Sequence, residues 1–423
     1  MTIYNWIIRG GRVIDPLNSI DQVLDIAIAQ GKIVEIAPAI DPAESDHLYQ
    51  ARGQIVVPGL IDLHIHGYDR VTPLGIPVDH YCLGRGVTTA VDAGSAGANT
   101  FAGFRVFAAE RSKTRLLAFL NISSAGLAFA GLGGDSEVAG ELDLLKLIDL
   151  KGAMQCVERN RDLIVGVKVR LSKSVADGGR NEEIAYERAL ELAGTEKLPL
   201  MVHRSFSSVP LDQCLGRMRR GDIYTHMYHG FPGTIIDSQS RRVAVTVRMV
   251  QSRGVLFDVG HGQGSFNWTV AEQCAGEGFW PDTISSDLHA GTCEGPAYDL
   301  PTVMTRLLRV GMPLTEIIRC CTENAAKAFG WEDRIGTLGK GREADVTVLS
   351  VEPVECELED CQGQLRRISS RIVPLAVWRA GEPSKLTQPQ QWPNGLKAAS
   401  QRKYWERLEI RDLRLDHLPH VRL

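Results

Sequence analysis

The chain has 423 residues, of which 44% are hydrophobic and 23% are charged, and its formal net charge is −4. This composition is that of a globular protein, and the length exceeds one compact core of ordinary size, so we expect one large and one small domain. The small net charge and the lack of a basic cluster argue against nucleic acid and anionic membranes as partners.

The cysteines and the N-terminal residues bear on the cellular compartment of the protein. The nine cysteines have no disulfide-framework spacing, which suggests free thiols in a reducing environment. The N-terminus shows no basic segment followed by an apolar core, and no apolar run approaches the ~20 residues of a membrane helix. We therefore expect a cytoplasmic protein without membrane contact.

Short strands separated by turns are predicted at both ends of the chain. In residues 1–54 they are punctuated by turn signals such as Gly10-Gly11, because glycine permits the backbone angles that tight turns need. The stretch from Gly336 to Ala380 has the same character. We predict that residues 1–54 and 333–385 pair into one small domain.

Apolar strands alternate with amphipathic helices between these ends, over residues 55–332. Helical stretches fit between the strands, such as Asn181 to Ala193 and Pro313 to Phe329. Eight strand–helix units predict an α/β fold, a (β/α)8 TIM barrel whose active site lies at the C-terminal strand ends. Residues 386–423 form a polar, Arg-rich tail, and the alternatives for it are a helix packed on the barrel and a helix packed on a neighbouring subunit. The predicted strands are Ile55 to Leu63, Val87 to Asp92, Leu116 to Ile122, Leu163 to Leu171, Leu198 to Val202, Ile223 to Tyr228, Val255 to Val259 and Thr283 to Ser286.

Two histidines end the first barrel strand, at His64 and His66. Residues i and i+2 of a strand point to the same side, so both imidazoles face one common point. Two neutral imidazoles on a rigid strand suit a divalent metal such as zinc. A strand with two unrelated histidines is the alternative, and the ends of the later strands argue against it.

The strand from Leu163 to Leu171 carries a lysine at an unusual place. Its alternation sets Gly166, Lys168 and Arg170 on one face, opposite a wholly aliphatic face. Both cations then point into the barrel, where an unpaired ammonium group is unfavourable. Burial lowers the pKa of a lysine, and the neutral amine can react with CO₂ to form a carbamate that bridges two metals. The alternative is a lysine that reaches solvent at the strand tip.

Three later strands end in His203, His226 and Asp287. Each residue alone has an ordinary explanation, either a core histidine or a helix N-cap. All three nevertheless fall at the end of the barrel where active sites are built, together with the histidine pair and the lysine. Their common position predicts a metal centre.

The order His-x-His, Lys, His, His, Asp on strands one, four, five, six and eight resembles the amidohydrolase superfamily. The stretch from Gly339 to Asp345 and the Gly-Gly-Arg-Val-Ile-Asp-Pro opening look like that family's split β-sandwich. Three further phrases resemble its dihydroorotase-like deacetylase subgroup: Gly86 to Gly97, Thr225 to Gly230 and Asp258 to Gly262. That subgroup is linked to hydrolysis of acyl esters or amides, here expected to be acetyl groups, of small α-substituted carboxylates.

A binuclear centre is what the resemblance implies. Two divalent metal ions, expected to be Zn²⁺, lower the pKa of a shared water. Asp287 is then the catalytic residue, taking a proton from the attacking hydroxide and passing it to the leaving oxygen or nitrogen. The resemblance also implies homo-oligomers. The implied ligands are His64, His66 and Asp287 for the buried metal, His203 and His226 for the outer metal, and carbamylated Lys168 as the bridge.

Candidate substrate contacts rest on weaker signals. Arg170 suits a bidentate pair with a substrate carboxylate, although a structural ion pair is the alternative. His229, His261 and His289 follow the strand ends, and one or two of them are expected to hydrogen-bond the substrate. Asp62 is expected to orient a ligand imidazole.

Two other functions are the alternatives. A cyclic-amide hydrolase, dihydroorotase-like or hydantoinase-like, uses the same metals. Typical dihydroorotases carry an Arg two residues after the second His, where this chain has Tyr68. A non-catalytic relative is expected to lose ligands, whereas all six are present. The presence of Lys168 also argues against a mononuclear deaminase.

Overall fold

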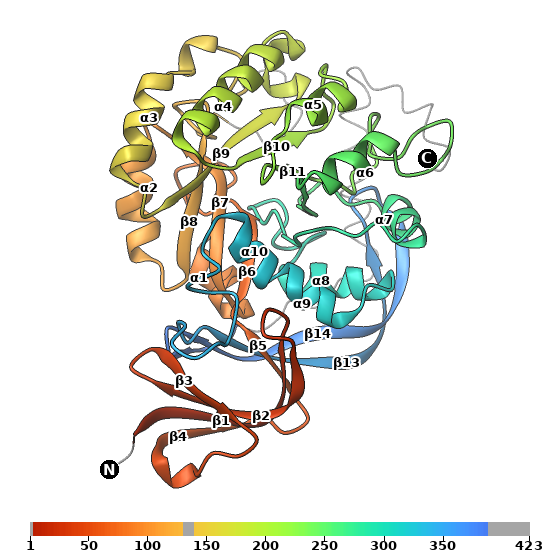
Figure 1. The fold of residues 1–423 in the computed structure, drawn as a ribbon. Coiled ribbons are helices and arrows are strands. Elements are labelled where there is room, and N and C mark those ends of the chain that lie inside the picture. The colour runs from red at the N-terminus through yellow and green to blue at the C-terminus, as the bar shows by residue number, and fades with distance from the viewer. Residues whose placement is uncertain (1–2, 130–138, 388–423) are drawn as a thin grey trace.

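Two sheets dominate the computed structural model, which describes residues 3–129 and 139–387 (Figure 1). An eight-stranded sheet is built from both ends of the chain, and a seven-stranded parallel sheet follows the middle of the chain. The predicted C-terminal tail lies outside the described residues from position 388 onward. No helix in the described ranges is long and apolar enough to span a bilayer.

The eight-stranded sheet joins the two chain ends, as the turn-rich patterns predicted. Its order is β15-β14-β13-β5-β1-β2-β3, with β4 paired to β1. The ends meet where β5 pairs antiparallel with β13. A register shift between Ile8 and Gly11 lets β1 continue as one strand through Gly10-Gly11, where the sequence signalled a turn. The strands are β1 (Tyr4–Asp15), β2 (Ile20–Ala29), β3 (Lys32–Ala37), β4 (Ser45–Gln50), β5 (Ile55–Pro58), β13 (Val346–Glu359), β14 (Leu365–Arg379) and β15 (Glu382–Ser384).

The first predicted barrel strand is in fact two strands that belong to different sheets. β5 lies in the terminal sheet, whereas β6 (Leu60–Ile65) begins the parallel sheet. Gly59 separates them, and a Cβ atom there would lie 2.3 Å from Thr88 Oγ1 and 2.8 Å from Asp345 Cβ. Only glycine allows this approach without displacing a neighbour, so the chain changes sheets at this residue.

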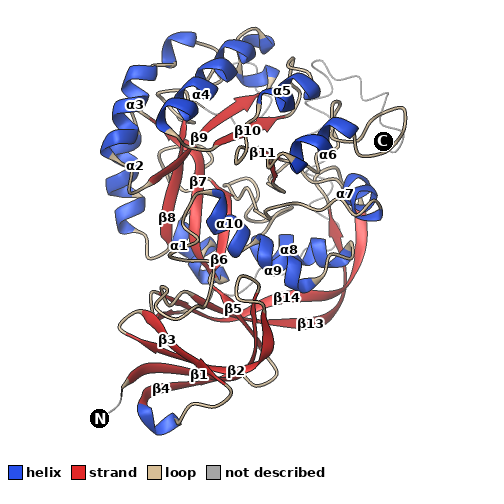
Figure 2. Cartoon of the chain, viewed as in Figure 1, coloured by secondary structure: helices blue, strands red, loops and turns tan. Residues whose placement is uncertain are grey.

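The parallel sheet runs in chain order from β6 to β12, and helices α2, α3 and α4 lie outside β7, β8 and β9 (Figure 2). On β9, Val167 and Val169 belong to the large outer core that also contains Ala189 of α4. A separate inner cluster includes Phe119 and Met201. After β6, the strands of the parallel sheet are β7 (Val87–Gly97), β8 (Arg115–Asn121), β9 (Ile164–Leu171), β10 (Leu200–Arg204), β11 (Ile223–Thr225) and β12 (Leu256–Phe257).

The eighth predicted strand, Thr283 to Ser286, is not a continuous strand. Isolated parallel bridges join Asp258 to Thr283 and Ile65 to Leu288. The Asp287 backbone N–H donates to the His64 carbonyl at 2.7 Å. The segment therefore lies between β12 and β6 and connects the last strand to the first.

Ten α-helices occur in the described ranges. The helix predicted from Pro313 to Phe329 is two helices, because Thr322 between them has φ −134° and ψ −90°. The helices are α1 (Val78–Tyr81), α2 (Phe101–Phe107), α3 (Leu150–Arg159), α4 (Glu182–Glu196), α5 (Leu211–Arg217), α6 (Val245–Ser252), α7 (Trp268–Gly276), α8 (Leu300–Arg309), α9 (Leu314–Cys320) and α10 (Glu323–Ala328).

A buried ion-pair cluster joins the two sheets, and it yields a stability prediction. Arg115 at the start of β8 pairs with Asp345 and Glu343 beside β13. We expect Arg115→Ala to lower the free energy of unfolding by about 3–5 kcal/mol, because it leaves the buried Asp345 carboxylate without its ion-pair partner. Arg105→Ala, which breaks the more exposed pair with Asp162, should lower it by about 1 kcal/mol or less. Urea unfolding measures both, and equal effects would contradict the prediction.

Candidate metal centre

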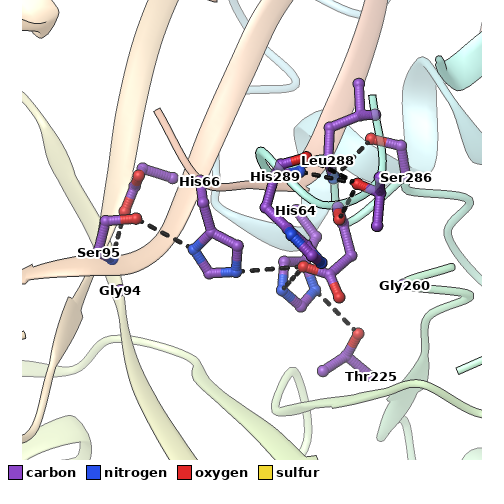
Figure 3. A network of polar contacts seen from close by, with 12 residues as sticks. His64, His66, Gly94, Ser95, Thr225, Gly260, Ser286, Leu288 and His289 are labelled. Atoms are coloured by element: carbon purple, nitrogen blue, oxygen red, sulfur yellow. Dashed lines mark hydrogen bonds and ion pairs between the residues drawn. The ribbon is translucent and has the colours of Figure 1, made fainter. Parts of the chain in front are cut away.

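Two imidazoles and one carboxylate meet at the C-terminal end of the parallel sheet (Figure 3). His64 Nε2 lies 3.2 Å and His66 Nε2 lies 3.1 Å from Asp287 Oδ1. One ligand atom from each residue lies within 4.8 Å of the others, and all three side chains are buried. β6 supplies His64, His66 follows it directly, and the segment beside β6 supplies Asp287. This is the geometry that the spacing predicted for a metal site.

The hydrogen bonds of the imidazoles decide which ring nitrogens carry protons. His226 Nδ1 is 2.6 Å from the Gly260 carbonyl oxygen. A carbonyl only accepts, so Nδ1 carries the proton and Nε2 has a lone pair. His64 Nδ1 contacts Thr225 Oγ1 at 3.1 Å, and His66 Nδ1 contacts Ser95 Oγ at 3.0 Å. Each Nδ1 is thus engaged by the protein, which leaves the Nε2 atoms to bind a ligand.

Two buried atoms at this point lack a hydrogen-bond partner among the described residues, His226 Nε2 and Asp287 Oδ1. A buried acceptor without a donor is unfavourable, and several acceptors that face one another repel. A divalent cation bound between them removes both problems, and imidazole nitrogens with a carboxylate oxygen are suitable zinc ligands. The residues present therefore fit a divalent metal.

The other three predicted ligands lie beside this group. Lys168 Nζ is 3.3 Å from His64 Nε2. The His226 ring is 5.1 Å from the His64 ring and 4.3 Å from the His203 ring, measured between centroids. The structure therefore brings all six predicted residues into one cluster.

Lys168 is buried on β9. Its side chain is 1% exposed, and Nζ contacts Met201 Sδ at 3.3 Å. Burial lowers the pKa of Lys168 to about 7, because the ammonium form loses its hydration. At neutral pH a large fraction of this amine is uncharged and nucleophilic.

Two candidate ligands occupy a strained backbone conformation. His226 has φ 68° and Asp287 has φ 48°, in the left-handed region that non-glycine residues seldom adopt. Such outliers are found mainly at functional sites, where surrounding structure maintains them. The left-handed conformation of His226 also explains why β11 ends at Thr225, before the predicted end at Tyr228. The sequence pattern could not show this change of direction.

The prediction for Asp62 is wrong. Its carboxylate accepts from the backbone N–H groups of His64 at 3.3 Å and of Ser286 at 3.0 Å, and from the Ser286 hydroxyl. It therefore ties β6 to the closing segment and contacts no imidazole ring. Burial raises the pKa of Asp62 to about 7. Ser95 and Thr225 contact the rings instead, and both lie in phrases that carried the family resemblance.

Arg170 forms an ion pair with Glu141. Its Nε and Nη2 donate to the two oxygens of Glu141 at 2.5 and 2.7 Å. Glu141 is fully buried, and sequence reasoning missed it because it lies in an irregular loop. This bidentate pair fixes the plane of the guanidinium group.

The three remaining candidate histidines differ in what they can still bind. Arg306 Nε donates to His261 Nε2 at 2.8 Å, and His261 Nδ1 contacts the Gly262 carbonyl at 2.9 Å. Both ring nitrogens of His261 are thus engaged inside the protein. His289 Nδ1 accepts from Gly291 N–H at 3.1 Å, and the His289 ring is 6.2 Å from the His66 ring.

His229 has one ring nitrogen without a partner. Its Nδ1 accepts from the Phe231 N–H at 3.2 Å, and Nε2 has no hydrogen-bond partner among the described residues. Burial lowers the pKa of His229 to about 3, with a further contribution from Arg204. The imidazole is therefore neutral, and Nε2 carries a proton that it can donate.

Comparisons with known proteins agree with this site. The model of the amidohydrolase family matches residues 268–383. A deacetylase from Agrobacterium fabrum is 33% identical over 83% of this chain and 84% of its own length. Crystal structures of an adenine deaminase and of a dihydroorotase are each 30% identical to the chain. Their TM-scores are 0.83 and 0.81, and the matches cover 90% and 91% of this chain and 100% and 99% of theirs.

The chain belongs to the amidohydrolase family. It is therefore a metal-dependent hydrolase that acts on small molecules, which confirms the resemblance seen in the sequence.

Gly260 offers a test of the metal centre. Its φ is 49°, and a Cβ atom would lie 2.2 Å from Thr225 Oγ1 and 2.8 Å from His226 Nδ1. We expect Gly260→Ala to lower divalent-metal content at least tenfold, because both imidazole contacts must shift. Gly278→Ala is the matched control, since Gly278 has φ 65° but no atom within 4 Å of its Cβ position. Elemental analysis after dialysis measures both variants, and equal metal content would contradict the prediction.

Proposed function

We propose that this protein is a binuclear zinc hydrolase that removes an acetyl group, held as an ester or amide, from a small α-substituted carboxylate. The observation that carries the proposal is the buried set of unprotonated imidazole nitrogens and carboxylate oxygen beside Lys168. The likeness to a deacetylase over most of both chains supports acyl cleavage. Divalent cations held at this site supply the Lewis acidity that activates water and polarises a carbonyl group.

The six clustered residues divide into two ligand groups in this proposal. His64, His66 and Asp287 hold the inner cation. His226 binds the outer cation through Nε2, and His203 through Nδ1, because its Nε2 contacts Ser205 Oγ at 2.7 Å. Neutral Lys168 adds through Nζ to CO₂ and loses a proton, and the resulting carbamate bridges the two positions. Its place 3.3 Å from His64 Nε2 supports this role.

Asp287 transfers the proton. Asp287 Oδ1 lies 3.2 Å from His64 Nε2 and 3.1 Å from His66 Nε2, beside the place proposed for the cations. Its carboxylate accepts a proton from the attacking water. Delivery of that proton to the leaving oxygen or nitrogen completes the cleavage of the acyl bond.

Substrate recognition is assigned to side chains around this centre. Arg170, held in plane by Glu141, pairs with the substrate carboxylate. His229 and His289 are the remaining candidates for a hydrogen bond to the substrate.

Cyclic-amide hydrolysis is the second candidate function, favoured by the likeness to a dihydroorotase structure. One observation weighs against it. The Tyr68 hydroxyl donates to the Thr100 carbonyl at 3.1 Å, and its ring packs edge-on against Phe104. The position where typical dihydroorotases carry an Arg therefore holds a neutral side chain that is engaged with α2.

The domain organisation follows from the same resemblance. We propose a (β/α)8 barrel over residues 59–332, a β-sandwich domain from residues 1–58 and 333–385, and a tail from residue 386 to 423. The boundary predicted at residue 55 moves to residue 59 because β5 pairs within the terminal sheet. The bridge from Ile65 of β6 to Leu288 and the bridge from Asp258 to Thr283 support a closed barrel. We also propose that the protein acts in the cytoplasm and as a homo-oligomer.

A hydrolysis screen tests the proposed function. The zinc- and bicarbonate-loaded protein is given O-acetyl and N-acetyl α-substituted carboxylates of both hands, beside hydantoin, dihydrouracil and dihydroorotate. We expect acetate release with a preference for one hand. Ring opening without acetate release would move the protein to the cyclic-amide hydrolases.

Lys168→Ala tests the bridging group. We expect it to lower both metal content and activity at least 100-fold, because the outer cation loses a bridging ligand. Lys151→Ala, at an exposed position of α3, is the control and should change neither. Unchanged metal content in Lys168→Ala would refute the bridging carbamate.

Metal loading should depend on pH and bicarbonate together. With a pKa of about 7 for Lys168, the neutral fraction of the amine rises from about 10% at pH 6 to about 90% at pH 8. We expect bicarbonate to accelerate recovery of activity in the metal-free protein several-fold more at pH 8 than at pH 6. A bicarbonate effect that is equal at both pH values would contradict this role of the amine.

A further inference from the structure

We propose that Asp258 and Thr225 are positioning residues that fix the tautomer of His64 and thereby set the affinity of the site for metal. This inference rests on the metal centre proposed above. It adds two residues that sequence reasoning did not single out and that bind no metal themselves.

The three side chains form a continuous buried chain from the metal site into the sheet. Thr225 Oγ1 lies 3.1 Å from His64 Nδ1, and Figure 3 shows this contact. The same hydroxyl donates to Asp258 Oδ2 at 2.7 Å. His64 is 1% exposed, and the other two residues are fully buried. Asp258 Oδ2 is 3.9 Å from His64 Nδ1, too far for a direct hydrogen bond, so the hydroxyl bridges the gap.

The direction of each hydrogen bond follows from the chemistry of the groups. An ionised carboxylate only accepts, and a hydroxyl has a single proton. Because Thr225 gives its proton to Asp258, its oxygen offers only lone pairs to His64. His64 Nδ1 must then carry a proton, so Nε2 of the neutral ring is unprotonated.

This tautomer is the one that a cation requires. His64 Nε2 points at Asp287 Oδ1, 3.2 Å away. If the Thr225 hydroxyl donated its proton to His64 Nδ1, the proton of the neutral ring would be on Nε2. That N–H would donate to Asp287 and occupy the position of the cation. Asp258 prevents this arrangement by accepting the hydroxyl proton.

Two further hydroxyl groups donate to the Asp258 carboxylate and hold it in place. Ser285 Oγ donates to Asp258 Oδ2 at 2.7 Å, and Thr283 Oγ1 donates to Oδ1 at 2.8 Å. Both residues belong to the segment that leads to Asp287. The segment that supplies the carboxylate ligand therefore also orients the group that controls His64.

Zinc affinity of the metal-free protein tests the proposal, measured by competition with a chromophoric chelator. Thr225→Val keeps the shape of the side chain but removes the hydroxyl, and we expect it to lower the affinity 10- to 100-fold. Thr225→Ser restores the hydroxyl and should remain within about threefold of the unchanged protein. Thr283→Val is the matched control, because it removes a donor to the same carboxylate without contact to His64, and it should also remain within about threefold.

A second measurement observes the tautomer directly. In metal-free protein labelled with ¹⁵N-histidine, we expect His64 to show the Nδ1–H form, and Thr225→Val to show a mixture of the two forms. Thr225→Ala replaces the valine variant if that variant does not fold.

Each outcome separates this inference from the proposed function. Unchanged zinc affinity in Thr225→Val would overturn the positioning role while the metal centre stands. Equal losses of zinc affinity in Thr225→Val and Thr283→Val would do the same. An Nε2–H form in the unchanged protein would also overturn it. If the unchanged protein binds no zinc, the proposed function fails, and the spectrum still decides the tautomer.

Discussion

The site depends on one electrostatic constraint: imidazole nitrogens and a carboxylate oxygen converge in a buried place, and two of these acceptors, His226 Nε2 and Asp287 Oδ1, have no hydrogen-bond partner among the described residues. The Gly260 carbonyl takes the only proton of the neutral His226 ring, and the Thr225 hydroxyl does the same for His64. Their Nε2 atoms and the Asp287 carboxylate then face one another, with the Lys168 amine as a neighbour of His64 Nε2. Such an arrangement is unfavourable unless a cation is bound. In this proposal the affinity for metal depends on the hydrogen bonds that the candidate ligands receive as well as on the ligands themselves.

The scaffold that maintains this arrangement is mostly backbone. The Asp287 N–H donates to the His64 carbonyl, and the His66 N–H donates to the Leu288 carbonyl. These bonds keep two of the ligand-bearing segments in register where the chain leaves regular strand geometry. The terminal sheet reaches the same region, since Arg306 of α8 donates both to His261 and to the Glu359 carbonyl at the end of β13. The loop that carries Gly260 and Gly262 is therefore braced from both sheets.

Fold and metal ligands alone do not select a substrate in this family. An adenine deaminase and a dihydroorotase share the fold at similar identity, and function is decided by side chains added to the common barrel. In this chain the informative positions are Lys168, for which we propose the bridging role, and Tyr68, which is engaged with α2. Glu141 matters as well, because it holds Arg170 in one plane.

The sequence by itself determined the ligand types, their order and the end of the sheet at which they gather. Strand periodicity and apolar runs are local properties, so His64, His66, Lys168, His203, His226 and Asp287 could all be predicted to meet. The ends of the strands could not be predicted, because His226 and Asp287 adopt left-handed backbone conformations that only tertiary contacts maintain. The same holds for the split at Gly59 and for the irregular eighth segment.

Only the tertiary structure decided which groups serve the ligands. Asp62, two residues from His64 in the chain, contacts backbone and serine groups, whereas Asp258 reaches the same histidine through Thr225. Arg170 is bound by Glu141 and His261 by Arg306, pairings between residues 29 and 45 positions apart. Such contacts depend on how distant segments pack, and no local pattern of residues records them.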